Sequence, residues 1–113
     1  MRAEVHAIEA NDISAWPEWR PSSPADELQW FTVSLGPVGH HGSDLFQIVV
    51  ATPAGLRERK KKEKFVGLIV DRFEPSLVEQ AIQNFVADCE ANTWEETVNN
   101  LRSRMHWEYE NYR

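Results

Sequence analysis

The hydrophobic residues of this 113-residue chain change their spacing once, after Phe73. Before Phe73 they recur mainly at every second position, as in strands, and after it they recur at helical spacing. Strands first and helices afterwards predict an α+β fold: an antiparallel sheet of about four strands with two C-terminal helices packed on one face. Because this length supports one hydrophobic core, we expect a single domain over residues 1–113.

Four segments carry the strand pattern, namely residues 3–8, 28–35, 45–52 and 65–73. Residues 28–35 alternate, with Phe31 and Val33 on one face. Residues 45–52 are apolar on both faces, as in a central strand, and Pro53 is expected to end it. The strands expected at residues 28–35 and 45–52 are therefore predicted to pair as a hairpin.

Two capping boxes predict the helix starts, Ser76 with Glu79 and Thr93 with Glu96. In such a box the hydroxyl and the carboxylate each accept from a free backbone N–H group. An apolar stripe follows each box, and the first stripe includes Cys89. The predicted core is Phe31, Val33, Phe46, Ile48, Val50, Leu68, Val70, Ile82, Phe85, Val86, Val98 and Leu101.

The net charge of −6 is unevenly distributed. Residues 57–64 hold six bases and two acids, so this basic run carries +4 and the rest of the chain carries −10. An acidic body disfavours nucleic acid and favours a basic protein partner. The run itself has three interpretations: a solvated hairpin loop, a phosphate-binding patch of a nucleic-acid-binding accessory domain, or a segment that aids solubility or orients a partner.

Residue types that carry chemistry are present without the spacing that chemistry needs. His40, His41 and Asp44 suggest a metal site or a small hydrolase, but adjacent turn histidines usually point apart and zinc-type paired ligands are missing. Glu95 and Glu96 are explained by their place in the first helical turn. Cys89 fits a buried inert thiol. We therefore predict a non-enzymatic protein without a cofactor or metal.

The location is predicted to be cytoplasmic. No apolar run approaches the roughly 18 residues of a membrane span, and the N-terminus lacks the apolar stretch of a secretory signal. A single cysteine cannot form an intramolecular disulfide.

The chain closes with His-Trp-Glu-Tyr-Glu-Asn-Tyr at residues 106–112, where rings alternate with acids. Trp and Tyr are enriched at binding hot spots, and carboxylates suit a basic partner. The helix before this segment already has a full apolar stripe, so we expect that the core does not need these rings and predict a partner-binding surface. Its predicted residues are Trp107, Glu108, Tyr109, Glu110 and Tyr112, joined by Asp44. If Trp107 is buried instead, the surface shifts outward to the other four tail residues.

Several segments resemble the immunity protein 8 family. They are LGP at 35–37, FQIVVATP at 46–53, LIVDRF at 68–73, TWEE at 93–96 and HWEYENY at 106–112. The family consists of small bacterial α+β domains of polymorphic-toxin systems. The resemblance implies an antitoxin that binds and neutralises a co-encoded toxin domain, and it implies no catalytic residues. Because many such toxins are nucleases with basic clefts, a basic toxin is the expected partner. The basic run departs from the family's usual loop.

Overall fold

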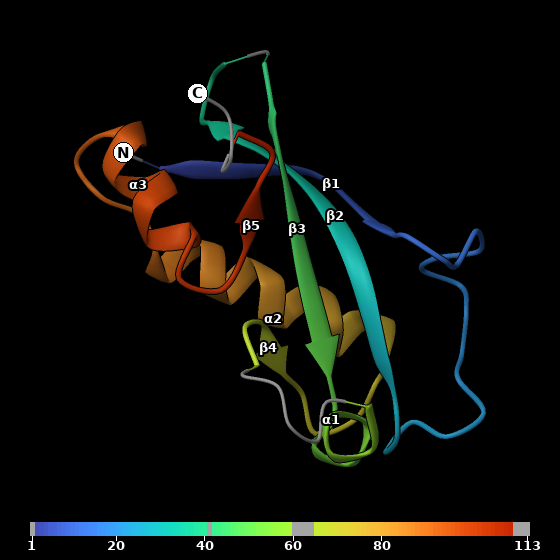
Figure 1. Cartoon of the computed structure of the whole chain (residues 1–113). Coiled ribbons are helices and arrows are strands. Elements are labelled where there is room, and N and C mark those ends of the chain that lie inside the picture. Colours follow the sequence, from blue (N-terminus) through green and yellow to red (C-terminus); the bar gives the residue numbers. More distant parts are fainter. Residues whose placement is uncertain (1, 41, 60–64, 110–113) are drawn as a thin grey trace.

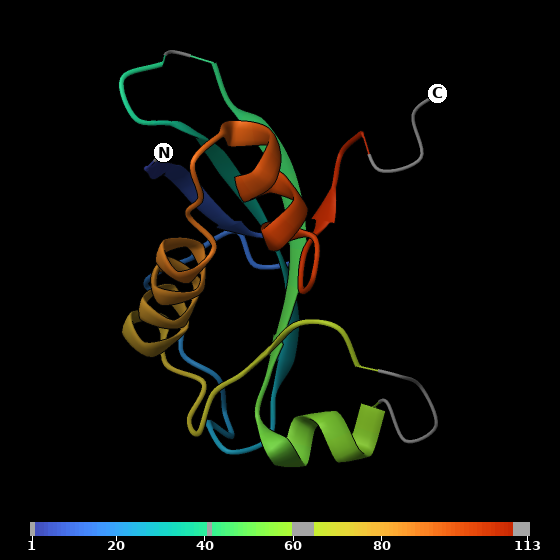
Figure 2. The same ribbon diagram turned by 90° about the vertical axis from the view of Figure 1, so that its left-hand side faces the viewer.

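The computed structural model describes residues 2–40, 42–59 and 65–109. Within them, five strands and three helices form one mixed sheet with helices packed on it. Their bounds are β1 Ala3–Ala10, β2 Leu28–Pro37, β3 Asp44–Ala51, α1 Pro53–Arg59, β4 Leu68–Ile69, α2 Pro75–Asp88, α3 Trp94–Leu101 and β5 His106–Trp107. The helices α2 and α3 lie on the same face of the sheet (Figures 1 and 2). The predicted α+β class is confirmed.

The three long strands form an antiparallel meander. Val33 at its centre pairs with Ile8 of β1 on one side and with Phe46 of β3 on the other. The register of β1 shifts between Val5 and Ala7, which marks a bulge. The predicted hairpin of the two central strands is confirmed.

The core lies between this sheet and the helices α2 and α3. Ten of the twelve predicted core residues are buried, whereas Leu68 and Phe85 are only partly buried and pack against the core's edge. Phe73, which was not predicted, is fully buried beside Phe31, with ring centroids 6.2 Å apart. The core is thus extended by the residue at which the spacing pattern changes.

Pro53 begins a helix, and the prediction that it merely ends a strand was incomplete. The buried Thr52 hydroxyl accepts from the Gly55 N–H group at 3.1 Å, as an N-cap residue does. Proline is well suited to the next position because its missing N–H group would be unpaired there. A side chain at Gly55 would overlap the backbone of Glu27, so α1 packs closely against the chain that enters β2.

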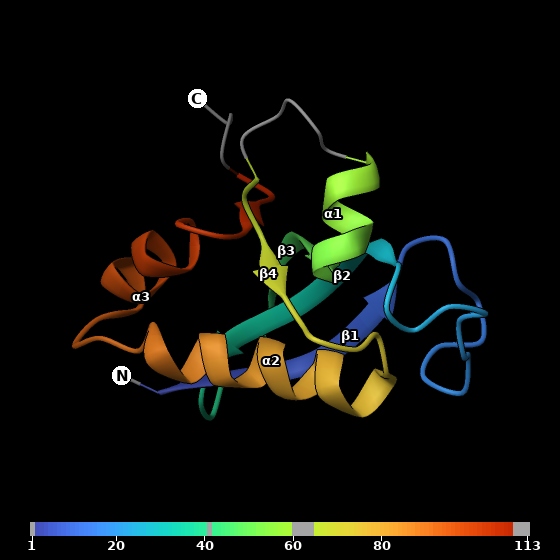
Figure 3. The same cartoon turned by 90° about the horizontal axis from the view of Figure 1, so that it is seen from below.

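The fourth strand is shorter than predicted, and it runs parallel to β3 where an antiparallel pair was predicted. Within residues 65–73, only Leu68 and Ile69 pair, in parallel with Val50 and Ala51 of β3. A parallel pair needs a crossover connection, which here includes α1. The interpretation of the basic run as a hairpin loop is therefore wrong. In Figures 1 and 3, β4 lies between α1 and α2.

Of the two predicted capping boxes, the one at the start of α3 makes the expected hydrogen bond of its N-cap residue. The Thr93 hydroxyl accepts from the Glu96 N–H group at 3.1 Å. Helix α2 instead begins at Pro75, and its N-cap residue Glu74 makes no side-chain cap. The Ser76 box is therefore wrong, because Ser76 lies inside the helix and not at its N-cap. Glu79 instead accepts from the Trp16 indole Nε1 at 3.0 Å, which ties the loop between β1 and β2 to α2.

Candidate functional site

The aromatic and acidic tail begins as a strand of the sheet. His106 pairs with Gln47 and Trp107 pairs with Phe46, so β5 lies antiparallel to β3. Glu108 continues the pairing, because its N–H group donates to the Leu45 carbonyl at 2.9 Å and its Oε1 accepts from the Leu45 N–H group at 3.0 Å. The tail is therefore anchored to the sheet over these three residues.

This pairing directs successive tail side chains to opposite sides of the sheet. Trp107 is the partner of buried Phe46 and packs against the core, where it is half-buried. His106 and Glu108 lie on the other face, the open face, where they are exposed. The expectation that the core does not need the tail rings is thus wrong for Trp107, which packs against the core while it stays partly exposed.

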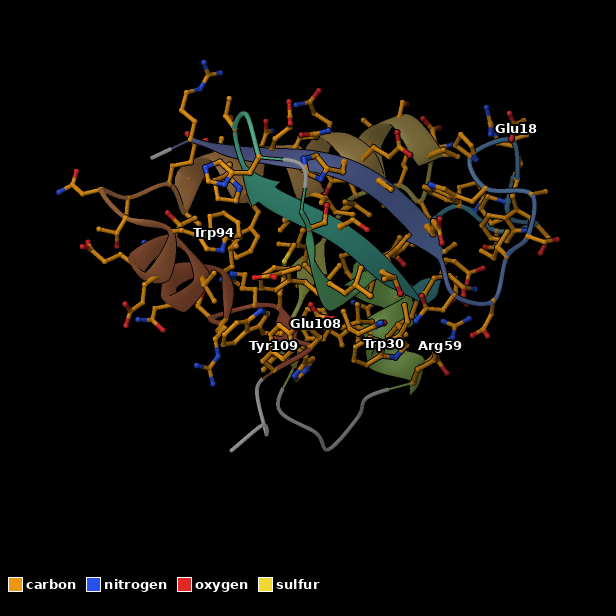
Figure 4. The ribbon with its side chains drawn as sticks, turned by 90° about the horizontal axis from the view of Figure 1, so that it is seen from above. Glu18, Trp30, Arg59, Trp94, Glu108 and Tyr109 are labelled. Carbon is orange, nitrogen blue, oxygen red and sulfur yellow. The ribbon has the colours of Figure 1, made fainter. Side chains whose placement is uncertain are left out.

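The open face is a polar surface that is organised before any partner arrives. Asn11, Thr32 and Gln47 form a closed ring of hydrogen bonds with distances of 2.7, 2.8 and 2.9 Å. The rings of Trp30 and His106 lie beside it with centroids 5.8 Å apart. Neither α2 nor α3 covers this face (Figure 1). Figure 4 places Trp30, Glu108 and Tyr109 along one side of the molecule, with α2 on the opposite side.

A groove of about 440 Å³ lies between α3 and β5. We call it the indole groove because two indole rings line it. Its lining residues are Asp44, Trp94, Glu95, Val98, Asn99, Arg102 and Trp107. The tertiary fold thus brings Asp44 next to Trp107, although they are 63 positions apart in the sequence.

The walls of the indole groove are held by ring contacts. Trp94 Nε1 donates to Asp44 Oδ2 at 3.4 Å, and the Arg102 guanidinium lies 5.9 Å from the centroid of the Trp107 ring. Tyr109 meets Trp107 edge-on, with centroids 5.3 Å apart. Trp107 Nε1 is buried and has no acceptor among the described residues. The groove therefore combines fixed rings with exposed charge.

The six predicted partner-binding residues have different positions in the structure. Asp44 and Trp107 are half-buried in the indole groove, whereas Glu108 is exposed and Tyr109 is 46% exposed. Glu110 and Tyr112 lie outside the described residues. Sequence reasoning missed Trp94 and Arg102 as part of this site because it assigned them to the helix alone.

The described histidines lie apart from one another. His40 is exposed on the turn after β2, His41 is outside the described residues, and His106 is on β5. His6 contacts both Ser43 and Glu4, and the Ser43 contact joins β1 to the loop before β3. Among residues 2–40, 42–59 and 65–109, no three His, Cys, Asp or Glu side chains are grouped to hold a metal ion.

The described part of the basic run is helical. Arg59 ends α1 and makes an ion pair with Asp26 at 2.8 Å, while Arg57 is exposed. Residues 60–64 of the run lie outside the described residues. One arginine of the proposed phosphate patch thus already has a carboxylate partner.

Cys89 is 5% exposed, and burial, with a smaller contribution from the Asp88 carboxylate, raises the pKa of its thiol from 9.0 to about 11. At pH 8 we expect the folded protein to react with a disulfide reagent at least about tenfold more slowly than the unfolded chain. Because the folded state binds this proton more tightly than the unfolded chain, the protonated thiol contributes to the free energy of unfolding below pH 9. This contribution is lost as the pH rises towards 11. Equal reaction rates would contradict a buried thiol, and Cys89→Ala is the control for the pH effect.

The family of the chain follows from comparison with known proteins. A family model described as Immunity protein 8 matches residues 3–112, which is nearly the whole chain. The chain therefore belongs to this family of immunity proteins, as its sequence resemblance indicated. No curated protein and no solved structure matched the chain. In the described part of the chain, every helix is too short or too polar to cross a bilayer.

Proposed function

We propose that this protein is a cytoplasmic antitoxin that neutralises a co-encoded bacterial toxin domain by binding it directly. Membership of an immunity protein family is the observation that carries this proposal. The acidic body of the chain, −10 outside the basic run, fits a toxin with a basic surface such as the phosphate-binding cleft of a nuclease. Complementary charge speeds association and discriminates against other partners.

The partner-binding surface proposed here is the exposed side of the tail together with the indole groove. Glu108 and Tyr109 directly follow the strand β5, and the Glu108 backbone is still held by its hydrogen bond to Leu45 of β3. Rings held in place lose little conformational freedom on binding, which favours tight association. Asp44 and Trp107 support this surface from the groove.

The test is to express the toxin domain of the neighbouring reading frame with and without this protein. We expect co-expression to restore growth and the two proteins to co-purify. Absence of both rescue and complex would refute the proposal. Binding of duplex DNA that weakens steeply with salt, and that is lost on replacing Lys60, Lys61 and Lys62 by Glu, would instead favour the nucleic-acid-binding alternative.

Glu108→Gln isolates the charge of the tail, because the amide oxygen can still accept from the Leu45 N–H group. We expect the association rate with the toxin to fall about two- to five-fold at low salt and the difference to shrink at high salt. Stopped-flow fluorescence measures this rate. Glu18→Gln is the matched control, since Glu18 is exposed on a loop far from Glu108 (Figure 4). Equal rates for both variants would place the interface elsewhere.

A further inference from the structure

We infer that the indole groove receives a cationic side chain, lysine or arginine, of the bound toxin. The inference rests on the proposed function and specifies one anchor of that complex. It concerns the end of the groove formed by Asp44, Trp94 and Glu95. A cation there would lie against an indole ring and between two carboxylates.

The chemistry of this end of the groove selects a cation. Glu95 is exposed and Asp44 is half-buried, so a bound cation meets one carboxylate at the rim and one deeper in the groove. The half-buried Trp94 ring supplies a face that attracts positive charge, and this attraction strengthens as water is excluded. Asp44 also accepts from Trp94 Nε1, which fixes the ring next to the carboxylate.

The other end of the groove shows the same type of contact within the chain. The Arg102 guanidinium lies over the Trp107 ring at 5.9 Å. Residues 94 and 102 are eight positions apart along α3 and its C-cap, which corresponds to about 12 Å. Arg102 therefore starts about two helical turns from Trp94, and its guanidinium is engaged with the Trp107 ring at its own end of the groove.

Trp107 lines the groove with a half-buried ring that also packs against the core. Its buried Nε1 has no acceptor among the described residues, and buried polar groups in native proteins nearly always have one. This N–H group is a donor, as are the head groups of lysine and arginine, so a bound cation does not pair with it and the cation site depends on Asp44, Glu95 and the Trp94 ring.

Single-charge variants test the inference in the complex with the toxin domain. We expect Glu95→Gln and Asp44→Asn each to weaken binding about tenfold, because a charge-assisted contact becomes a neutral one. Asp44→Asn retains an oxygen that can accept from Trp94. Glu96→Gln is the matched control, since it removes the same charge from the same helical turn and Glu96 does not line the groove. Calorimetry gives the dissociation constants.

The outcomes separate this inference from the proposed function. If the parent protein binds the toxin and the groove variants bind equally well, the inference is wrong and the proposed function stands. If the parent does not bind the toxin, both fail. A second measurement titrates n-butylguanidinium into the free protein and follows the Trp94 indole resonance. A saturable shift that disappears in the Asp44→Asn, Glu95→Gln double variant supports the inference, and identical titrations of the two proteins contradict it.

Discussion

Replacing Phe31 by alanine is expected to lower the free energy of unfolding by about 3–5 kcal/mol. Phe31 is fully buried in β2, and its ring contacts Trp16 and Phe73 at centroid distances of 4.9 and 6.2 Å. The truncation removes apolar contacts and leaves a cavity that surrounding rings, held by the sheet and the loop, can fill only in part. Urea unfolding monitored by circular dichroism measures the change.

Phe85→Ala is the matched control for this prediction. Phe85 also loses a benzyl side chain, but it is only partly buried on α2, so its truncation is expected to cost clearly less than that of Phe31. Equal losses at the two positions would mean that Phe31 is not at the centre of the core.

Replacing Tyr109 by alanine is expected to weaken toxin binding by about 2–4 kcal/mol, which corresponds to a loss of about 30-fold or more. Tyr109 is 46% exposed, yet its ring is held edge-on against Trp107. A ring that is both exposed and fixed can bury a large area on binding at little entropic cost. Surface plasmon resonance with the purified toxin domain measures the affinity.

Leu77→Ala controls for the loss of exposed apolar surface in general. Leu77 is 42% exposed on α2, which lies on the opposite side of the molecule from Tyr109 (Figure 4). We expect it to leave the affinity unchanged. If a folded Tyr109→Ala protein binds as tightly as the parent, the tail does not form the interface.

The sequence predicted the elements whose residues repeat over several turns or strand positions. The alternation in residues 28–35 and the helical stripe after Phe73 each involve many side chains, so one unusual residue does not obscure them. The helix α1 was missed although Thr52 and Pro53 form an ordinary helix start. That signal is local, and the apolar run before it favoured a strand ending at proline.

The functional surface was harder to predict, because its residues are close only in the folded chain. The composition of the tail indicated a binding segment, and Asp44 was named with it from the sequence. Which rings are buried depended on the two-residue strand β5, which exists only because β3 offers free backbone groups beside it. No periodicity can show a strand of that length.

The sequence by itself thus determined the fold class, the acidic character of the surface and the family. Each of these depends only on residue order and composition, which can be taken directly from the sequence. Only the tertiary structure decided that β4 runs parallel, that Trp107 faces the core and that Asp44, Trp94 and Glu95 share one groove. These features arise from contacts between segments that are distant in the sequence, and such contacts are fixed by packing and backbone pairing of the whole domain.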